Sequence, residues 1–126
     1  METVEIEFVQ PTEENQYRLF ADELENDPLV LFHGTTEDAA KSIIDEGFNP
    51  TEDLKSNSFG RDSGVPLGYS CSKRNPGTRG AVLAVQFDSL QVPCIREEGY
   101  VVYLDKPEIA HNVVAVCYVP KEYKHI

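Results

Sequence analysis

The sequence predicts an α+β domain, because two amphipathic helical patterns in its first half are followed by a series of short strand patterns. Its 126 residues correspond to one domain, since domains commonly hold about 100–200 residues. Apolar residues make up 40% of the chain and charged residues 26%, which is typical of a sequence that folds around a core. We therefore treat residues 1–126 as a single domain.

The first elements are a short strand and a helix. Residues 5–9 begin with an alternation of polar and apolar side chains, which indicates a strand. A helix is expected from Thr12, because a threonine cap is followed by acidic residues in the first turn. Its apolar face recurs at helical spacing as far as Leu24, and residues 26–28, Asn-Asp-Pro, end it.

A continuous apolar run at residues 29–33 predicts a buried central strand that ends at His33. Gly34 and Thr35 are expected to form the turn after it. A second helix then begins with a cap at Thr36, and four apolar residues, 39, 40, 43 and 44, face inward. Gly47 fits the left-handed position that ends such a helix, with Phe48 packed over the last turn.

The second half consists mostly of strand patterns. Residues 49–66 form a long polar stretch, and a loop of that length in a small domain is usually functional or mobile. Strands are predicted at residues 67–71, 81–87, 99–104 and 112–119, with a turn at residues 75–77. The expected sheet is mixed or antiparallel, with its two helices early in the chain.

The charge of the chain excludes several classes of partner. It carries 22 acidic and 11 basic residues, a formal net charge of −11. Proteins that bind nucleic acid gain most of their affinity from cations on phosphates, so this composition disfavours nucleic acid and anionic lipid. No apolar run approaches the ~20 residues of a membrane span, and the acidic N-terminus differs from a secretory signal.

Cysteine and histidine are too dispersed for a metal site. Cys71, Cys94 and Cys117 form no CxxC pair, so we interpret them as reduced, mostly buried side chains of an intracellular, cytoplasmic protein. The three histidines, His33, His111 and His125, are also dispersed and show no HExxH spacing, so no zinc site is expected.

Three segments carry the functional signal. The first is Leu-Phe-His-Gly-Thr-Thr at residues 31–36, followed by Glu-Gly-Phe at 46–48. The second is Phe-Gly at 59–60 with Gly-Tyr-Ser at 68–70, and the third is Arg-Glu-Glu-Gly-Tyr-Val-Val-Tyr at 96–103. In this order they resemble the ADP-ribosyltransferase superfamily, most closely its poly(ADP-ribose)-polymerase-like branch, over residues 29–119. The resemblance implies a small split-sheet fold that binds NAD in a cleft between two small sheets.

The resemblance also implies roles for individual residues. His33 would hydrogen-bond a ribose hydroxyl of NAD, the Gly34 backbone would hold the nicotinamide amide, and Tyr69 would stack on the nicotinamide ring. An acid at Glu97 or Glu98 would stabilise the positive charge that develops on the ribose as nicotinamide leaves. The remaining expected NAD contacts are Thr35, Ser58, Arg61, Ser70 and Arg79, of which Arg79 suits the pyrophosphate.

The sequence departs from the family pattern at three places. One is the absence of an obvious adenosine-binding segment, for which the polar loop at residues 49–66 is the expected replacement, with Ser58, Arg61 and Asp62 as candidate contacts. The family places its acid directly before the Tyr-Val-Val-Tyr strand, where this chain has Gly99. Plain alternation along the strand favours Glu97, whereas a bulge at Gly99 would favour Glu98, which is nearer the strand start and which we list first. The family also places a helix between the Tyr69 strand and the next one, and residues 73–80 have room only for a turn.

Two other functions share these motifs. RNA 2′-phosphotransferases also carry His-Gly-Thr, a later Arg-Gly as at Arg79, and an ending similar to residues 119–123, but they need basic residues to grip RNA, which the net charge disfavours. A non-catalytic binding module on the same fold is the other alternative. The expected function is transfer of ADP-ribose from NAD to a protein or small-molecule acceptor, within the cell or as a delivered effector. The sequence leaves the oligomeric state open.

Overall fold

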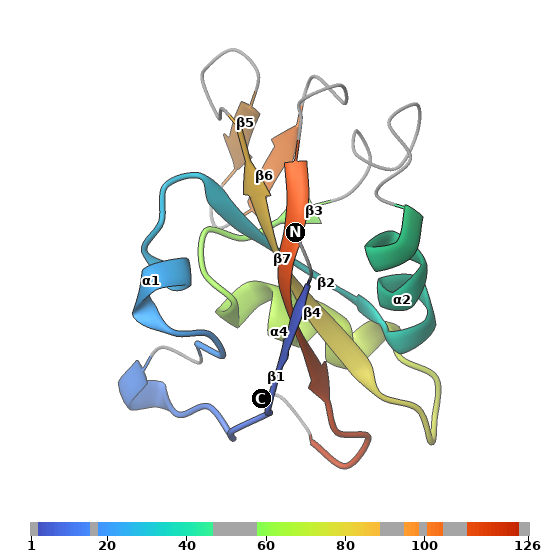
Figure 1. Cartoon of the computed structure of the whole chain (residues 1–126). Helices are drawn as coiled ribbons and strands as arrows, with labels where there is room; N and C mark the ends of the chain where they lie inside the picture. Colours follow the sequence, from blue (N-terminus) through green and yellow to red (C-terminus); the bar gives the residue numbers. More distant parts are fainter. Residues whose placement is uncertain are drawn as a thin grey trace.

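A computed structural model describes residues 3–15, 18–46, 58–88, 95–98, 101–104 and 111–123. Figure 1 shows the arrangement of the elements. In chain order they are β1 (Val4–Ile6), the 3₁₀ helix η1 (Glu13–Asn15), α1 (Asp22–Glu25), β2 (Val30–Thr36), α2 (Glu37–Glu46), β3 (Ser58–Phe59), α4 (Gly64–Lys73), β4 (Gly80–Phe87), β5 (Ile95–Glu98), β6 (Val101–Leu104) and β7 (His111–Val119). The predicted α+β class with a mixed sheet is confirmed.

The strands form two sheets. The larger is four-stranded in the order β1-β7-β4-β2, with β1 parallel to β7 and the other pairs antiparallel. The smaller has the order β3-β6-β5 and lies at the top of Figure 1. The two meet at Phe32, whose N–H donates to the Gly60 carbonyl at 2.9 Å, while the Gly60 N–H donates back at 2.8 Å.

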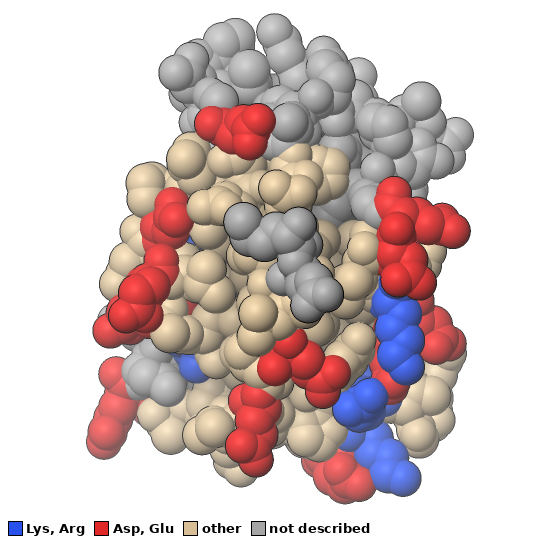
Figure 2. All heavy atoms as spheres, in the orientation of Figure 1, with Lys and Arg blue, Asp and Glu red and all other residues tan. Residues whose placement is uncertain are grey.

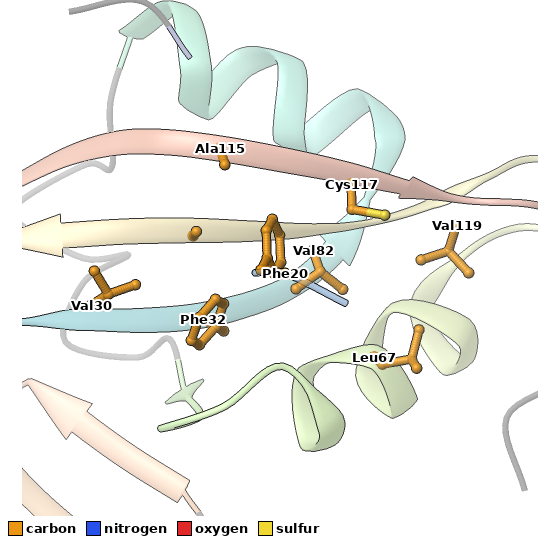
Figure 3. Packing of buried hydrophobic residues seen from close by; sticks show 9 residues of the cluster. Phe20, Val30, Phe32, Leu67, Val82, Ala115, Cys117 and Val119 are labelled. Carbon is orange, nitrogen blue, oxygen red and sulfur yellow. The ribbon is translucent and has the colours of Figure 1, made fainter. Parts of the chain in front are cut away.

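Each face of the larger sheet carries its own apolar cluster. Alternate residues of β2, β4 and β7 pack with α2 on one face, where Leu31, Leu83 and Val116 are buried. The other face packs against α4 and the segment around Phe20. Figure 3 shows side chains of this second cluster, with Phe32 and Val82 from the sheet and Leu67 from α4. The sheet is therefore covered on both sides, which explains the continuous apolar runs of β2 and β4.

Pro66, in the first turn of α4, packs directly on two glycines. A Cβ placed on Gly34 would lie 1.9 Å from the Pro66 carbonyl oxygen, and a Cβ on Gly60 would lie 2.7 Å from its Cδ. Gly34 belongs to β2 and Gly60 follows β3. The two glycines let α4 approach both backbones closely, so their small size serves packing.

The structure corrects the expected first helix. Among the described residues of this segment, η1 and α1 are helical, and residues 18–21 before α1 are not. The reason is the buried carboxylate of Glu25, which accepts the N–H groups of Leu19 and Phe20 at 3.2 and 3.0 Å. It also accepts the Ser63 N–H at 3.0 Å and the Ser63 hydroxyl at 2.6 Å. These tertiary hydrogen bonds replace the helical ones, and they fix the N-terminal segment to the start of α4.

Two further expectations on the first half are corrected in part. The strand predicted at residues 5–9 is β1, which ends at Ile6. The strand predicted at 29–33 continues to Thr36, so Gly34 and Thr35 form no turn but pair with Val82 and Ala81 of β4. As a result His33 lies in the middle of β2 and not at its end. In the four-stranded sheet β2 is an outer strand, whereas a central strand was expected.

The second helix is confirmed as α2, with its cap: the Ala39 N–H donates to the Thr36 hydroxyl at 3.2 Å. Gly47 and Phe48 lie outside the described residues, as do residues 49–57 of the expected loop. The rest of that stretch contains β3 and the first residues of α4. The strands predicted at 81–87 and 112–119 are confirmed as β4 and β7, and β6 covers the described part of the one predicted at 99–104.

The strand predicted at residues 67–71 is wrong, because this segment lies within α4. Leu67 and Ser70 are buried at a spacing of three residues, which is helical and not alternating. Pro66 is tolerated because it lies in the first turn. Among the described residues, no helix is long and apolar enough to span a membrane.

Gly34→Ala is expected to lower the free energy of unfolding by about 3 kcal/mol, because the new methyl group meets the Pro66 backbone and cannot be relieved by a side-chain rotation. Gly77→Ala is the matched control: φ there is 80° and no atom lies within 4 Å, so only the backbone strain of about 1 kcal/mol should appear. Urea denaturation of both variants measures the difference. Equal losses would contradict the close packing.

Candidate functional site

His33 lies where the two sheets meet. Its exposed fraction is 2%, and strand alternation places it with Leu31 and Thr35 on the face that α2 covers. The imidazole packs on the Phe59 ring of β3, with ring centroids 5.4 Å apart and a tilt of 47°. Each of these two residues directly precedes a glycine that packs on Pro66. Because Gly34 and Gly60 pack on the same proline, the relative position of His33 and Phe59 is fixed.

Phe59 continues this contact into a row of rings. Its centroid is 5.8 Å from that of Phe87 in an edge-on arrangement, and Phe87 is 5.7 Å from His111. The row crosses from β3 to β4 and β7. In the sequence, Phe59 is part of a Phe-Gly pair to which we assigned no role. The feature that could have indicated its importance is that it is an apolar residue directly before a glycine within a polar stretch.

The two candidate acids lie on β5, at the far side of the smaller sheet. The register pairs Glu97 with Val102 and Glu98 with Val101. Val102 in turn pairs with Phe59. Glu97, Val102 and Phe59 thus occupy one row of positions across the sheet, and Glu98 lies in the next row. The side chains of both acids and the expected bulge at Gly99 lie outside the described residues. The backbone pairing alone gives the positions of Glu97 and Glu98.

The structure does not bring Tyr69 to His33. Tyr69 lies on α4 with 38% of its surface exposed, and α4 packs on the face of β2 opposite His33, against Phe32 and Gly34. Ser70 is buried on the same helix, where its hydroxyl donates to the Leu67 carbonyl at 2.7 Å. The stacking role of Tyr69 and the NAD contact of Ser70 stay predictions, although both residues lie on a helix instead of the expected strand.

The other expected NAD contacts are dispersed around the place where the two sheets meet. Thr35 is buried two residues after His33 on the same face of β2. Ser58 pairs with Tyr103 in the smaller sheet, and Arg61 is exposed just after Gly60. Ser58 and Arg61 thus flank the Phe59–Gly60 contact, whereas Arg79 lies at the start of β4, beside α2.

The basic residues near β4 are engaged within the protein. Arg79 donates from Nε to Glu37 Oε1 at 2.9 Å and from Nη2 to Oε2 at 2.6 Å, and its guanidinium lies 4.5 Å from the centroid of the Tyr118 ring. Arg74 donates to the carbonyls of Pro120, at 2.7 Å, and Tyr123. These contacts fix the start of α2 and the segment after β7, which explains both arginines structurally.

Metal and thiol chemistry find no support in the described part of the chain. It contains no group of three His, Cys, Asp or Glu side chains placed to hold a metal ion. Cys117 is buried, and burial, with a smaller effect of Glu5, raises the pKa of its thiol to about 12. It therefore stays protonated and serves packing. Cys71 is partly buried, and Cys94 lies outside the described residues.

Comparison with known proteins gives no match: no family model matches the chain, and neither the curated proteins nor the solved structures contain one that does.

Glu37 provides a test of the arginine contacts. Hydrogen bonds from Arg79 and Lys41 lower its pKa from 4.5 to about 2. A depressed folded-state pKa contributes stability above the unfolded pKa and loses it as the pH falls through the folded one. Glu37→Gln should therefore cost about 1 kcal/mol at pH 7, since the pair is partly exposed.

The difference between wild type and Glu37→Gln should disappear as the pH is lowered from 4.5 toward 2. Thermal or urea unfolding across this range measures it. Glu23→Gln, an exposed acid on α1, is the control and should show little change at any pH. A constant difference for Glu37→Gln down to pH 2 would contradict the ion pair.

Proposed function

We propose that the chain is an ADP-ribosyltransferase-like domain that binds NAD where the two sheets meet and transfers ADP-ribose to a protein or small-molecule acceptor. The observation that carries this is the row of positions that leads from Glu97 through Val102 to Phe59, whose ring packs on His33. A histidine on one sheet and an acid on the adjoining sheet are two polar groups that the resemblance requires.

The segment around Tyr69 differs from the family pattern. The family places a helix after its tyrosine strand, whereas here Tyr69 lies within α4, which packs on β2 and β4, and residues 74–79 before β4 contain no helix. The aromatic residue beside His33 is Phe59 and not Tyr69. We therefore assign the ring that would flank nicotinamide to Phe59, with Tyr69 as the alternative.

In the proposed reaction the bond between nicotinamide and the ribose C1′ breaks, and neutral nicotinamide leaves with the bonding electron pair. The ribose becomes cation-like, and a nucleophile of the acceptor attacks C1′ and loses its proton. Glu97 would stabilise the developing positive charge by its carboxylate. His33 would hold a ribose hydroxyl and so orient the bond that breaks.

A non-catalytic NAD-binding or partner-binding module is the second candidate, and the burial of His33 favours it. With 2% of its surface exposed, His33 packs as a core residue. An RNA 2′-phosphotransferase is supported less, because Arg74 and Arg79 are already bonded within the protein and the chain carries a net charge of −11.

The test is release of nicotinamide from NAD, measured for wild type and for Glu97→Gln and Glu98→Gln separately. Glu97→Gln is expected to lower the rate about 100-fold, as loss of one transition-state contact does, while Glu98→Gln retains activity. The double variant Glu13→Gln/Glu14→Gln removes the same kind of adjacent acids from η1 and should release nicotinamide as wild type does.

A thermal-shift titration with NAD separates the two candidates. Stabilisation by NAD without nicotinamide release would establish the binding module instead of the enzyme. Neither stabilisation nor release would overturn both NAD-dependent functions. Loss of activity in Glu98→Gln alone would transfer the role of the acid to Glu98.

A further inference from the structure

A groove lies where β1 and β7 diverge, away from His33. On one side it is bounded by β1 and the residues that follow, and on the other by the end of β7 and the turn at residues 120–122. Its volume is about 560 Å³, within the range of sites that hold a ligand or several side chains. Arg79 and Tyr118 contribute to its lining.

The groove is apolar inside and continues into exposed apolar surface. Ile6, Phe8 and Pro120 line it together with the Tyr118 ring. Of the three large apolar side chains exposed among the described residues, two belong to the same segment: Val4, 59% exposed, and Val9, 74% exposed. Val4 and Val9 directly precede and follow the segment 5–8 that lines the groove, and exposed apolar residues beside an apolar groove are typical of a surface that contacts another protein.

The charged residues around the groove are mostly acidic and unpaired. Glu5, Glu7 and Glu122 are exposed, and within the described residues their carboxylates make no hydrogen bond or salt bridge, although Glu5 lies close enough to Arg79 to raise its pKa. Of the two cations that line it, Arg79 is neutralised by Glu37, which leaves Lys121. Figure 2 shows acidic side chains over β1 on this face, whereas the Lys and Arg side chains gather beside α2.

β1 also offers a backbone edge. It is the outer strand of the larger sheet, and β7 is its only partner among the described residues. An outer strand leaves alternate N–H and carbonyl groups available to an added strand.

We propose that this groove binds an extended protein segment that carries lysine or arginine side chains. The aliphatic stem of such a side chain fits the apolar lining between Phe8 and Tyr118, and its cationic end meets the carboxylates of Glu5, Glu7 and Glu122. A second copy of this chain is a poorer occupant, because it would bring the same carboxylates together on two molecules with a net charge of −11 each.

The test uses a fluorescent peptide of about eight residues in which lysine alternates with valine, so that one face of the added strand is cationic. Binding is measured by anisotropy at about 0.15 M salt, where the Debye length of roughly 8 Å limits attraction by distant charges. The wild-type protein should bind it, and a peptide with glutamine in place of lysine should bind at least about fivefold more weakly.

Glu5→Gln/Glu7→Gln should weaken lysine-peptide binding by about fivefold, whereas Glu13→Gln/Glu14→Gln, with the same change of net charge, should leave it unchanged. Peptide-induced NMR shifts are expected at Ile6, Phe8 and Tyr118. Equal weakening by the two double variants, shifts elsewhere, or no binding would overturn the proposal, as would self-association of the free protein through β1 in sedimentation. These variants leave the proposed NAD site intact, so nicotinamide release is tested independently.

Discussion

The packing of Pro66 between Gly34 and Gly60 is the constraint on which the rest of the structure depends. It seats α4 directly on the backbone of β2 and of the segment after β3, where any side chain at either glycine would collide with the proline. Ser63, three residues before the proline, is bound by the Glu25 carboxylate, so the N-terminal segment is fixed to the same place. The Phe32–Gly60 bridge attaches the smaller sheet there as well. One contact thus organises both sheets, and the glycine of the His-Gly-Thr motif has a packing role whatever the chain binds.

Arg74 and the exposed Arg79 serve contacts within the protein, whereas most of the described acidic side chains face solvent. Arg74 and Arg79 are bonded to carbonyls and to Glu37, and they fix the ends of α4, α2 and β7. The buried carboxylate of Glu25 accepts four hydrogen bonds from described groups. Three of the donors are backbone N–H groups and the fourth is the Ser63 hydroxyl, so none of them is a cation. Most of the acidic surplus therefore stays at the surface, where it disfavours anionic ligands over most of the molecule and leaves the groove beside β1 suited to cations.

Elements with long, regular patterns were predictable from the sequence. The periodicity of α2, the continuous apolar run of β4 and the valine-rich sequence of β7 are strong local signals that packing did not override. Residues 67–71 were mistaken for a strand because a short apolar run fits either structure, and only contact with Gly80 and Phe32 decides for a helix. The helix expected after Thr12 failed because Glu25 captures N–H groups that a helix would need. For the candidate site, the sequence indicated His33 and the pair Glu97–Glu98 as candidates, and these stay predictions. The proximity of Phe59 to His33 depends on the register of three strands and on Pro66, which lie far apart in the chain.

The pairing of β1 with β7 has a consequence for how the protein is made. Val4 finds its partner at Ala115, and the Thr3 hydroxyl donates to the Val113 carbonyl at 2.8 Å. The first described strand thus has no partner until the last one has been synthesised, which takes roughly 5 to 20 s at ordinary rates of translation. During that time its apolar residues Val4, Ile6 and Phe8 are exposed, and their acidic neighbours Glu5 and Glu7 keep the nascent segment from associating with other chains. The parallel pairing of the two ends makes closure of the larger sheet a late and slow event in folding.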